Sequence, residues 1–190
     1  MPTLTDVNGL GRDAFVALLG DAFEHAPWVA GRAWAARPFG TVAALHDAMM
    51  EAVRSAPAAE RLAFLNGHPE LAGAEARARR MTADSTAEQG GAGLDSLSAA
   101  DFDRFGRLNA AYRSKFGFPF IIAVRGRGKD EILAAFERRL GRDPSVEEAA
   151  ALAEVGTITR MRLDRLIADA PPNRAPGPDH VGRRTPGMEN

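Results

Sequence analysis

Residues 98–117 read SAADFDRFGRLNAAYRSKFG, and this stretch decides the fold class. Apolar side chains recur at Phe102, Phe105, Leu108 and Tyr112, the spacing that places them on one face of an α-helix. A serine that can cap the first turn precedes this face, and a glycine that can end the helix follows it. The stretch therefore predicts a long helix with one buried face.

On both sides of this helix, similar apolar stripes predict further helices. The stripes lie at 15–23, 45–52, 62–65, 132–140 and 152–166, and the Ala- and Arg-rich residues 74–83 are also expected to be helical. Thr41 is suited to cap the second of these helices, and Gly67 and Gly141 are suited to end two others. The chain is therefore predicted to be all-α, a compact bundle of about eight helices.

Two segments depart from the helical pattern. Residues 118–124 read FPFIIAV and could form a strand, but no second run of this kind is present to pair with it. We therefore expect an extended, buried connector there. Residues 170–190 hold five prolines and few apolar side chains, which predicts a disordered tail after a single domain at 1–169.

Composition excludes several classes of function. The chain has 190 residues, a formal net charge of -1 and no cysteine. Disulfides, thiolate nucleophiles, Cys-ligated zinc and iron–sulfur clusters are thereby excluded, as are the zinc nucleobase deaminases. The balanced charge gives no reason to expect nucleic acid as a partner, and no window of 18 apolar residues predicts a membrane span. With no signal-peptide pattern at its start, the protein is expected to be soluble and cytoplasmic.

His68 is the first candidate functional residue. It stands between Gly67 and Pro69, which force the backbone out of a helix, so loop geometry sets the direction of its imidazole. An imidazole titrates near neutral pH and suits proton transfer, although a structural or exposed histidine is an open alternative. No metal site is predicted, because the histidines form neither an i, i+4 pair nor an HExxH motif.

Residues 85–89 read STAEQ and bring hydroxyls, a carboxylate and a carboxamide together. One interpretation is a capping box, in which Ser85 and Glu88 bond to backbone N–H groups at the start of a helix. The other is a binding or catalytic segment. The two are compatible in part, because free N–H groups at a helix start favour an anionic ligand.

Arg162 lies four residues after Ile158 and therefore on the same helical face, at the edge of a core-facing stripe. A guanidinium there could bind a carboxylate or ureido group with two hydrogen bonds. A surface arginine is the alternative, since Arg160 and Arg165 are close in sequence. Residues 126–130 read GRGKD and lack the spacing of a phosphate-binding loop.

Five segments, taken in order, resemble the OHCU decarboxylase family, the 2-oxo-4-hydroxy-4-carboxy-5-ureidoimidazoline decarboxylases of purine degradation. They read GHPELA at 67–72, STAEQ at 85–89, LNAAY at 108–112, FGFPFI at 116–121 and ITRMRL at 158–163. The resemblance covers about residues 4–168. It implies an all-helical homodimer that converts the small molecule OHCU to (S)-allantoin, a step of urate catabolism, without a cofactor.

The resemblance also implies a set of site residues. The family's catalytic histidine falls on His68 and its essential glutamate on Glu88, and its arginine falls on Arg162, with Arg160 as the alternative. The substrate-binding positions fall on Pro69, Ser85, Thr86, Ala87, Gln89, Phe120, Ile121, Ile122, Ala123 and Val124. The chain departs from the family at Glu70, where an aspartate is usual, at Thr157, where a basic residue is frequent, and at Asn66-Gly67.

Two other functions are compatible with the residues. In a non-enzymatic helical binding module, His68 and Glu88 would be loop and capping residues, and no pocket would join them to Arg162. In a metal-free ureide hydrolase, the same histidine and glutamate would activate water.

Overall fold

The computed structural model describes residues 1–73 and 81–168, which fold into nine α-helices and two 3-10 turns without a β-strand. The helices are α1 (Leu4–Gly9), α2 (Arg12–Leu19), α3 (Pro27–Ala33), α4 (Val42–Arg54), α5 (Ala58–Asn66), α7 (Ala83–Gly91), α8 (Ala99–Phe116), α9 (Lys129–Leu140) and α10 (Pro144–Leu166). The all-α prediction is confirmed. The predicted tail and most of the helix expected at 74–83 lie outside the described residues.

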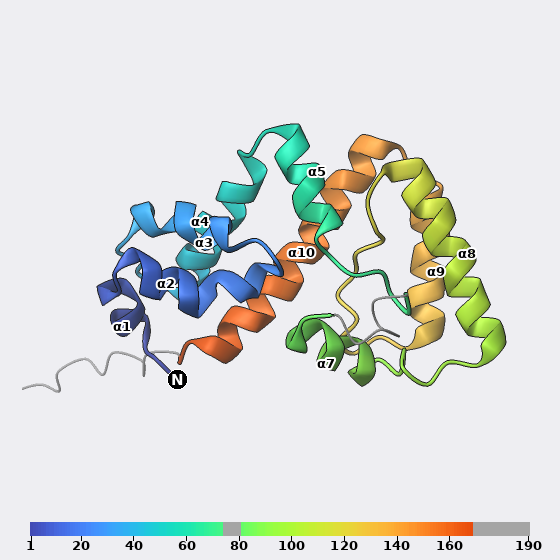
Figure 1. Ribbon diagram of the computed structural model, residues 1–190, viewed down its shortest axis with the longest axis horizontal. Helices are drawn as coiled ribbons and strands as arrows, with labels where there is room; N and C mark the ends of the chain where they lie inside the picture. The colour runs from blue at the N-terminus through green and yellow to red at the C-terminus, as the bar shows by residue number, and fades with distance from the viewer. Residues whose placement is uncertain (74–80, 169–190) are drawn as a thin grey trace, which may run out of the picture.

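Helix α10 links the two sides of the molecule (Figure 1). The N-terminal helices α1 to α4 gather on one side, where α10 packs against α4, and α8 and α9 pack together on the other side, where α10 meets α8. Asp143 is the N-cap of α10, and Pro144 occupies its first turn, where the missing N–H of proline costs no hydrogen bond. One long helix therefore carries residues to both sides, and its second half reaches the region between them.

Helix α8 forms as its sequence predicts. The Ser98 hydroxyl accepts a hydrogen bond from the Asp101 N–H at its start, and Gly117 ends it at φ 79°, a conformation that favours glycine. Its inward face carries Tyr112, whose ring contacts a group of aromatic side chains: Phe116, Phe118, Phe120 and Phe136. This cluster fixes α8 and α9 around the segment that follows Gly117.

Residues 118–124 form the predicted connector: they are buried and belong to no strand. Because the segment has no strand partner, its main chain is held by side chains. Arg139 Nη1 donates to the Ile121 carbonyl oxygen at 2.8 Å, and the Ala123 N–H donates to Glu154 Oε2 at 2.9 Å. Both anchors come from the α9–α10 side, so the other side of the connector is available to line a site.

The predicted N-terminal stripe at 15–23 is divided by the structure. Helix α2 ends at Leu19, and a 3-10 turn, Gly20–Phe23, continues the stripe to Glu24. A Cβ at Gly20 would lie 3.2 Å from Pro27 Cβ, so the glycine permits this close approach. Helix α1, which Thr3 and Asp6 cap, has no counterpart among the predicted helices. In the described ranges, no helix is long and apolar enough to cross a membrane.

Helix α7 starts three residues earlier than the capping-box interpretation requires. Its N-cap is Thr82, whose hydroxyl accepts from the Ser85 N–H at 3.2 Å. Ser85 therefore lies inside the first turn rather than before it, and Glu88 lies one turn further along. The capping-box interpretation, one of the two that the sequence allows, is therefore wrong, and the side chains of Ser85 and Glu88 bond to other partners.

Candidate active site

His68 lies in the turn that follows α5. Its backbone N–H donates to the Leu65 carbonyl at 3.2 Å, and its ring stands edge-on to Phe64 with 5.1 Å between the ring centroids. Only 7% of the residue is exposed. The loop expectation is thus confirmed, but the imidazole is a buried group rather than a surface one.

The protonation state of His68 follows from its surroundings. Burial lowers the pKa of the imidazole below the ordinary 6.5, and the negative charge of Glu24 opposes this shift without reversing it. Nδ1 lies 3.2 Å from the Phe64 carbonyl oxygen, which can only accept, so Nδ1 carries the proton. Nε2 is then left with its lone pair, and at neutral pH His68 is equipped to act as a base.

Arg162 projects from α10 and is 2% exposed. Its guanidinium forms two hydrogen bonds with Glu88, from Nε to Oε1 at 3.0 Å and from Nη2 to Oε2 at 2.8 Å. Nη1 donates to Glu24 Oε2 at 2.7 Å and to the Ala22 carbonyl at 3.4 Å, and Nη2 also donates to Ser85 Oγ at 3.2 Å. All five N–H donors of the guanidinium are therefore engaged.

Glu24 is the partner of Arg162 that the sequence analysis missed. It is 2% exposed, has φ 54° directly after the 3-10 turn, and accepts hydrogen bonds from Thr82 Oγ1 at 2.7 Å and Ser85 Oγ at 2.8 Å. Burial raises the pKa of Glu24, but the charge of Arg162 and these hydrogen bonds outweigh burial, and the pKa lies below its ordinary value. The signal available in the sequence was a carboxylate directly after the apolar pair Ala22-Phe23.

The same carboxylates act on Arg162 in return. Burial would lower the pKa of its guanidinium, yet the hydrogen bonds and charges of Glu88 and Glu24 raise the pKa above its ordinary value. Arg162 is therefore a permanent cation held between two carboxylates. The alternative of a surface arginine applies instead to Arg160, which is bonded to Asp164 on the outside of α10.

One cavity of about 40 Å³ brings most of the predicted residues together. Its lining consists of His68, Pro69, Leu71, Ser85, Glu88, Gln89, Phe120, Ile121, Ile122, Val124, Ile158 and Arg162. The binding-module alternative predicted that no pocket would join His68, Glu88 and Arg162, and the structure contradicts it. Leu71 and Ile158 also line the cavity, although the sequence did not predict them as site residues.

Three predicted positions are not brought to this cavity. Thr86 and Ala87 are exposed on the outer face of α7, and the Thr86 hydroxyl bonds back to the Thr82 carbonyl. Ala123 is buried, but its N–H is committed to Glu154 behind the connector. The prediction took whole segments as binding residues. Successive side chains on a helix or an extended chain face different sides, so some residues of each segment point away from the cavity.

Gln89 both lines the cavity and fixes the loop that carries His68. Its Oε1 accepts from the Ala72 N–H at 3.1 Å, and its Nε2 donates to the Glu70 carbonyl at 3.3 Å. Asn109 of α8 adds a bond from Nδ2 to the Leu71 carbonyl at 2.9 Å. The loop is thus anchored to two helices, which holds the imidazole in place.

Comparison with known proteins gives a consistent result. The model of the family described as OHCU decarboxylase matches residues 8–164. The 2-oxo-4-hydroxy-4-carboxy-5-ureidoimidazoline decarboxylase of Haloferax volcanii is 46% identical over 161 residues, which are 85% of this chain and 94% of that protein.

Two solved structures share the fold. A crystal structure of (S)-allantoin synthase has a TM-score of 0.69 and 31% identity, over 88% of this chain and 54% of its own. A crystal structure of OHCU decarboxylase in the presence of (S)-allantoin has a TM-score of 0.63 over 84% of this chain and 100% of its own; at 24% identity, this likeness concerns the fold alone.

Proposed function

Because the chain belongs to the OHCU decarboxylase family, we propose that it removes carbon dioxide from OHCU to form (S)-allantoin in urate degradation. The observation that carries the proposal is the single cavity lined by His68, Glu88 and Arg162. A base, a carboxylate and a guanidinium around one small space are suited to a small, polar substrate whose reaction requires proton transfer.

The chemistry explains why acid–base groups suffice. When the bond to the carboxylate breaks, its electron pair passes into the adjoining ring C=N unit and carbon dioxide leaves. The carbon that bears the ureido group then gains a proton, and the neighbouring hydroxyl loses its proton to become a carbonyl. One further proton is taken up at nitrogen, so that charge balances. The ring itself is the electron sink, a task for which other decarboxylases use a cofactor.

His68 is proposed as the group that moves these protons. With Nδ1–H bonded to Phe64, the free Nε2 can accept the hydroxyl proton of the substrate and deliver it to carbon. The negative charge of Glu24 favours the imidazolium form of His68 during proton transfer, and the positive charge of Arg162 disfavours it. Delivery from one fixed ring would protonate one face and set the S configuration.

Substrate binding has to open the pair between Arg162 and Glu88. A space of about 40 Å³ is well below the roughly 300–1,000 Å³ of typical small-molecule sites, and every donor of Arg162 is engaged. We infer that a carbonyl or ureido oxygen of the substrate replaces Glu88 on Arg162. An ion pair with the scissile carboxylate would instead stabilise the ground state and be lost with carbon dioxide.

The connector contributes main-chain groups to binding. The carbonyl of Ile121 and the N–H of Ala123 are bonded on the α9–α10 side, whereas the main-chain groups of Phe120 and Ile122 have no hydrogen-bond partner within the described chain. Both residues line the cavity. We propose that their N–H and C=O groups bind the ring amide, which carries matching donors and acceptors.

A homodimer in the cytoplasm is part of the same proposal, on the strength of the family resemblance. Light scattering on the purified protein would measure the oligomeric state directly. A monomer at micromolar concentration would remove this part of the proposal without affecting the site.

Circular dichroism tests the proposed reaction. OHCU freshly generated in solution would be mixed with the protein, and the signal of (S)-allantoin followed against the spontaneous decay of OHCU in buffer. The proposal expects a rate proportional to enzyme concentration and an excess of the S enantiomer. A time course indistinguishable from buffer would refute it.

A further inference from the structure

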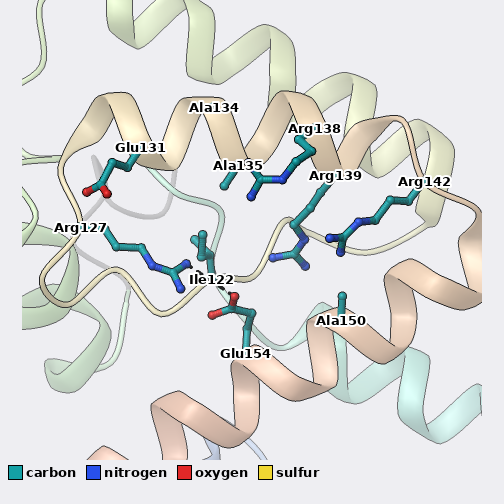
Figure 2. A pocket seen from close by; sticks show the side chains of 10 residues that line it. All are labelled: Ile122, Arg127, Glu131, Ala134, Ala135, Arg138, Arg139, Arg142, Ala150 and Glu154. Carbon is teal, nitrogen blue, oxygen red and sulfur yellow. Dashed lines mark ion pairs between the residues drawn. The ribbon is translucent and has the colours of Figure 1, made fainter.

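A second, larger cavity lies between α9 and α10, behind the connector. Its volume is about 370 Å³, and Ile122 lines both this cavity and the one that holds His68. Four arginines line it, Arg127, Arg138, Arg139 and Arg142, and Figure 2 shows the guanidinium groups of the last three turned toward the space below α9. The proposed reaction uses none of them.

Positive charge is in excess at the end of the cavity near Arg142. Arg139 and Arg142 share one carboxylate, that of Glu147, to which Arg139 Nε donates at 2.7 Å and Arg142 Nη1 at 3.4 Å. Arg138 has no ion pair or hydrogen bond to any side chain in the described ranges. Three guanidinium groups and one carboxylate leave two positive charges there.

Arg139 contributes its charge to the cavity, because its guanidinium is buried. The residue is 3% exposed, and its Nη2 lies 2.5 Å from Glu147 Oε1 without the alignment of a hydrogen bond. Among the described side chains, it is one of two that keep a buried polar atom unsatisfied. Because Nη2 is buried against the Glu147 carboxylate, Arg139 acts on a ligand in the cavity through its charge, and the hydrogen bonds to that ligand come from Arg138 and Arg142.

The opposite end of the cavity carries one arginine and two carboxylates, and therefore an excess of negative charge. Arg127 Nη1 lies 3.5 Å from Glu154 Oε1, and Glu131 Oε2 accepts from the Gly128 N–H at the start of α9. The carboxylates at this end would repel an anion. A bound anion is therefore confined to the region that Arg138, Arg139 and Arg142 surround (Figure 2).

We propose that this cavity binds a doubly charged oxyanion, inorganic phosphate or a phosphomonoester. Guanidinium groups match the tetrahedral oxygens of phosphate with paired hydrogen bonds, and two uncompensated positive charges match a dianion. The volume exceeds the needs of phosphate alone and leaves room for a small organic group. The site is separated from the His68 cavity by the connector.

Calorimetry without OHCU tests the site, so the result does not depend on the proposed reaction. Inorganic phosphate and glycerol 3-phosphate would be titrated at constant ionic strength into the wild type, Arg138→Ala and Arg142→Ala. Arg107→Ala is the matched control, because Arg107 is an exposed arginine on α8 outside the cavity. Each cavity variant should weaken binding on the order of tenfold, the loss of one hydrogen-bonded charge, and the control should bind as the wild type does.

Thermal unfolding gives an independent readout. The probe that binds should raise the Tm of the wild type and of Arg107→Ala, and raise it less in Arg138→Ala, whose exposed side chain makes no contact that folding requires. The proposal is overturned if neither probe binds saturably to the wild type. It is also overturned if both cavity variants bind as tightly as Arg107→Ala, since the anion would then occupy another site such as Arg162.

Discussion

Arg162 of α10 and Glu88 of α7, which are 74 positions apart, hold each other through two parallel hydrogen bonds of 3.0 and 2.8 Å. This contact closes the cavity that His68 lines, and it occupies two of the donors that a substrate would need. Arg162 is 2% exposed, whereas Glu88 is half-buried. Glu88 is therefore the side chain that has room to move. Glu88 therefore holds the site closed, and the substrate has to displace Glu88 from Arg162 in order to bind.

Replacing Glu88 by glutamine tests this displacement. The amide competes less strongly for Arg162 than the carboxylate does, so KM for OHCU should fall several-fold. The turnover number should fall as well, because the family resemblance places the essential glutamate at this position. Steady-state kinetics at saturating and limiting OHCU would separate the two effects.

Asp84→Asn is the matched control for Glu88→Gln. Asp84 is also on α7 and its carboxylate lies 3.9 Å from Arg162, but it does not line the cavity. Its KM and turnover should match the wild type. An unchanged KM in Glu88→Gln, or an equal change in Asp84→Asn, would show that opening of the pair does not limit binding.

Glu24 should prove essential for stability although no motif contains it. Replacing it by glutamine removes one of the two charges that compensate the buried Arg162, which is expected to lower the free energy of unfolding by about 3 kcal/mol. Chemical denaturation would measure the loss. Asp21→Asn, on the exposed side of the same turn, should change stability by less than about 0.5 kcal/mol, and a similar loss in both variants would contradict the assignment.

Local patterns predicted most of the fold. The start of α8 at Ser98, its end at Gly117 and the cap of α4 at Thr41 are encoded within a few residues, and the structure confirms each. Glu24 escaped prediction because its partner Arg162 is 138 positions away, and a charge pair at that distance leaves no periodic signal.

The capping-box interpretation of residues 85–88 was wrong for a related reason. Ser85 and Glu88 have the spacing of a capping box, but Thr82 supplies an equally good cap one turn earlier, and pairing with Arg162 and Glu24 draws the two side chains inward. A local motif was overridden by tertiary contacts. The exposed positions Thr86 and Ala87 entered the predicted site because family motifs are contiguous whereas cavity linings are not.

The buried His68 should make stability dependent on pH. Its pKa in the folded protein is below 6.5, whereas the unfolded chain takes up the proton near 6.5, so the unfolded state binds more protons at lower pH. The free energy of unfolding should therefore decrease as pH falls below about 6.5. The acid limb of kcat/KM should likewise lie below 6.5, since protonation removes the base.

His68→Asn identifies which part of this dependence belongs to the imidazole. Denaturation curves between pH 5 and 8 should show a shallower decline on the acid side for the variant than for the wild type. Identical declines would assign the effect to other groups, such as His46, whose pKa burial also lowers.

Thr82 should contribute to stability as the true cap of α7. Thr82→Ala removes the cap and the hydrogen bond to Glu24, with an expected cost of about 1–2 kcal/mol. Thr86→Ala alters an exposed hydroxyl on the same helix and should cost little. Thermal unfolding would distinguish them, and equal Tm values would argue against the observed helix start.

The rate of (S)-allantoin formation by His68→Asn shows whether the imidazole of His68 transfers the protons of the reaction. Asparagine can still donate to the Phe64 carbonyl, so helicity should be preserved while the proton-transferring nitrogen is removed. The wild type should accelerate the conversion of fresh OHCU well above its spontaneous decay, and the variant should lose about 10²–10⁴-fold of the turnover. Near-native turnover in a variant of unchanged helicity would mean that His68 does not transfer these protons.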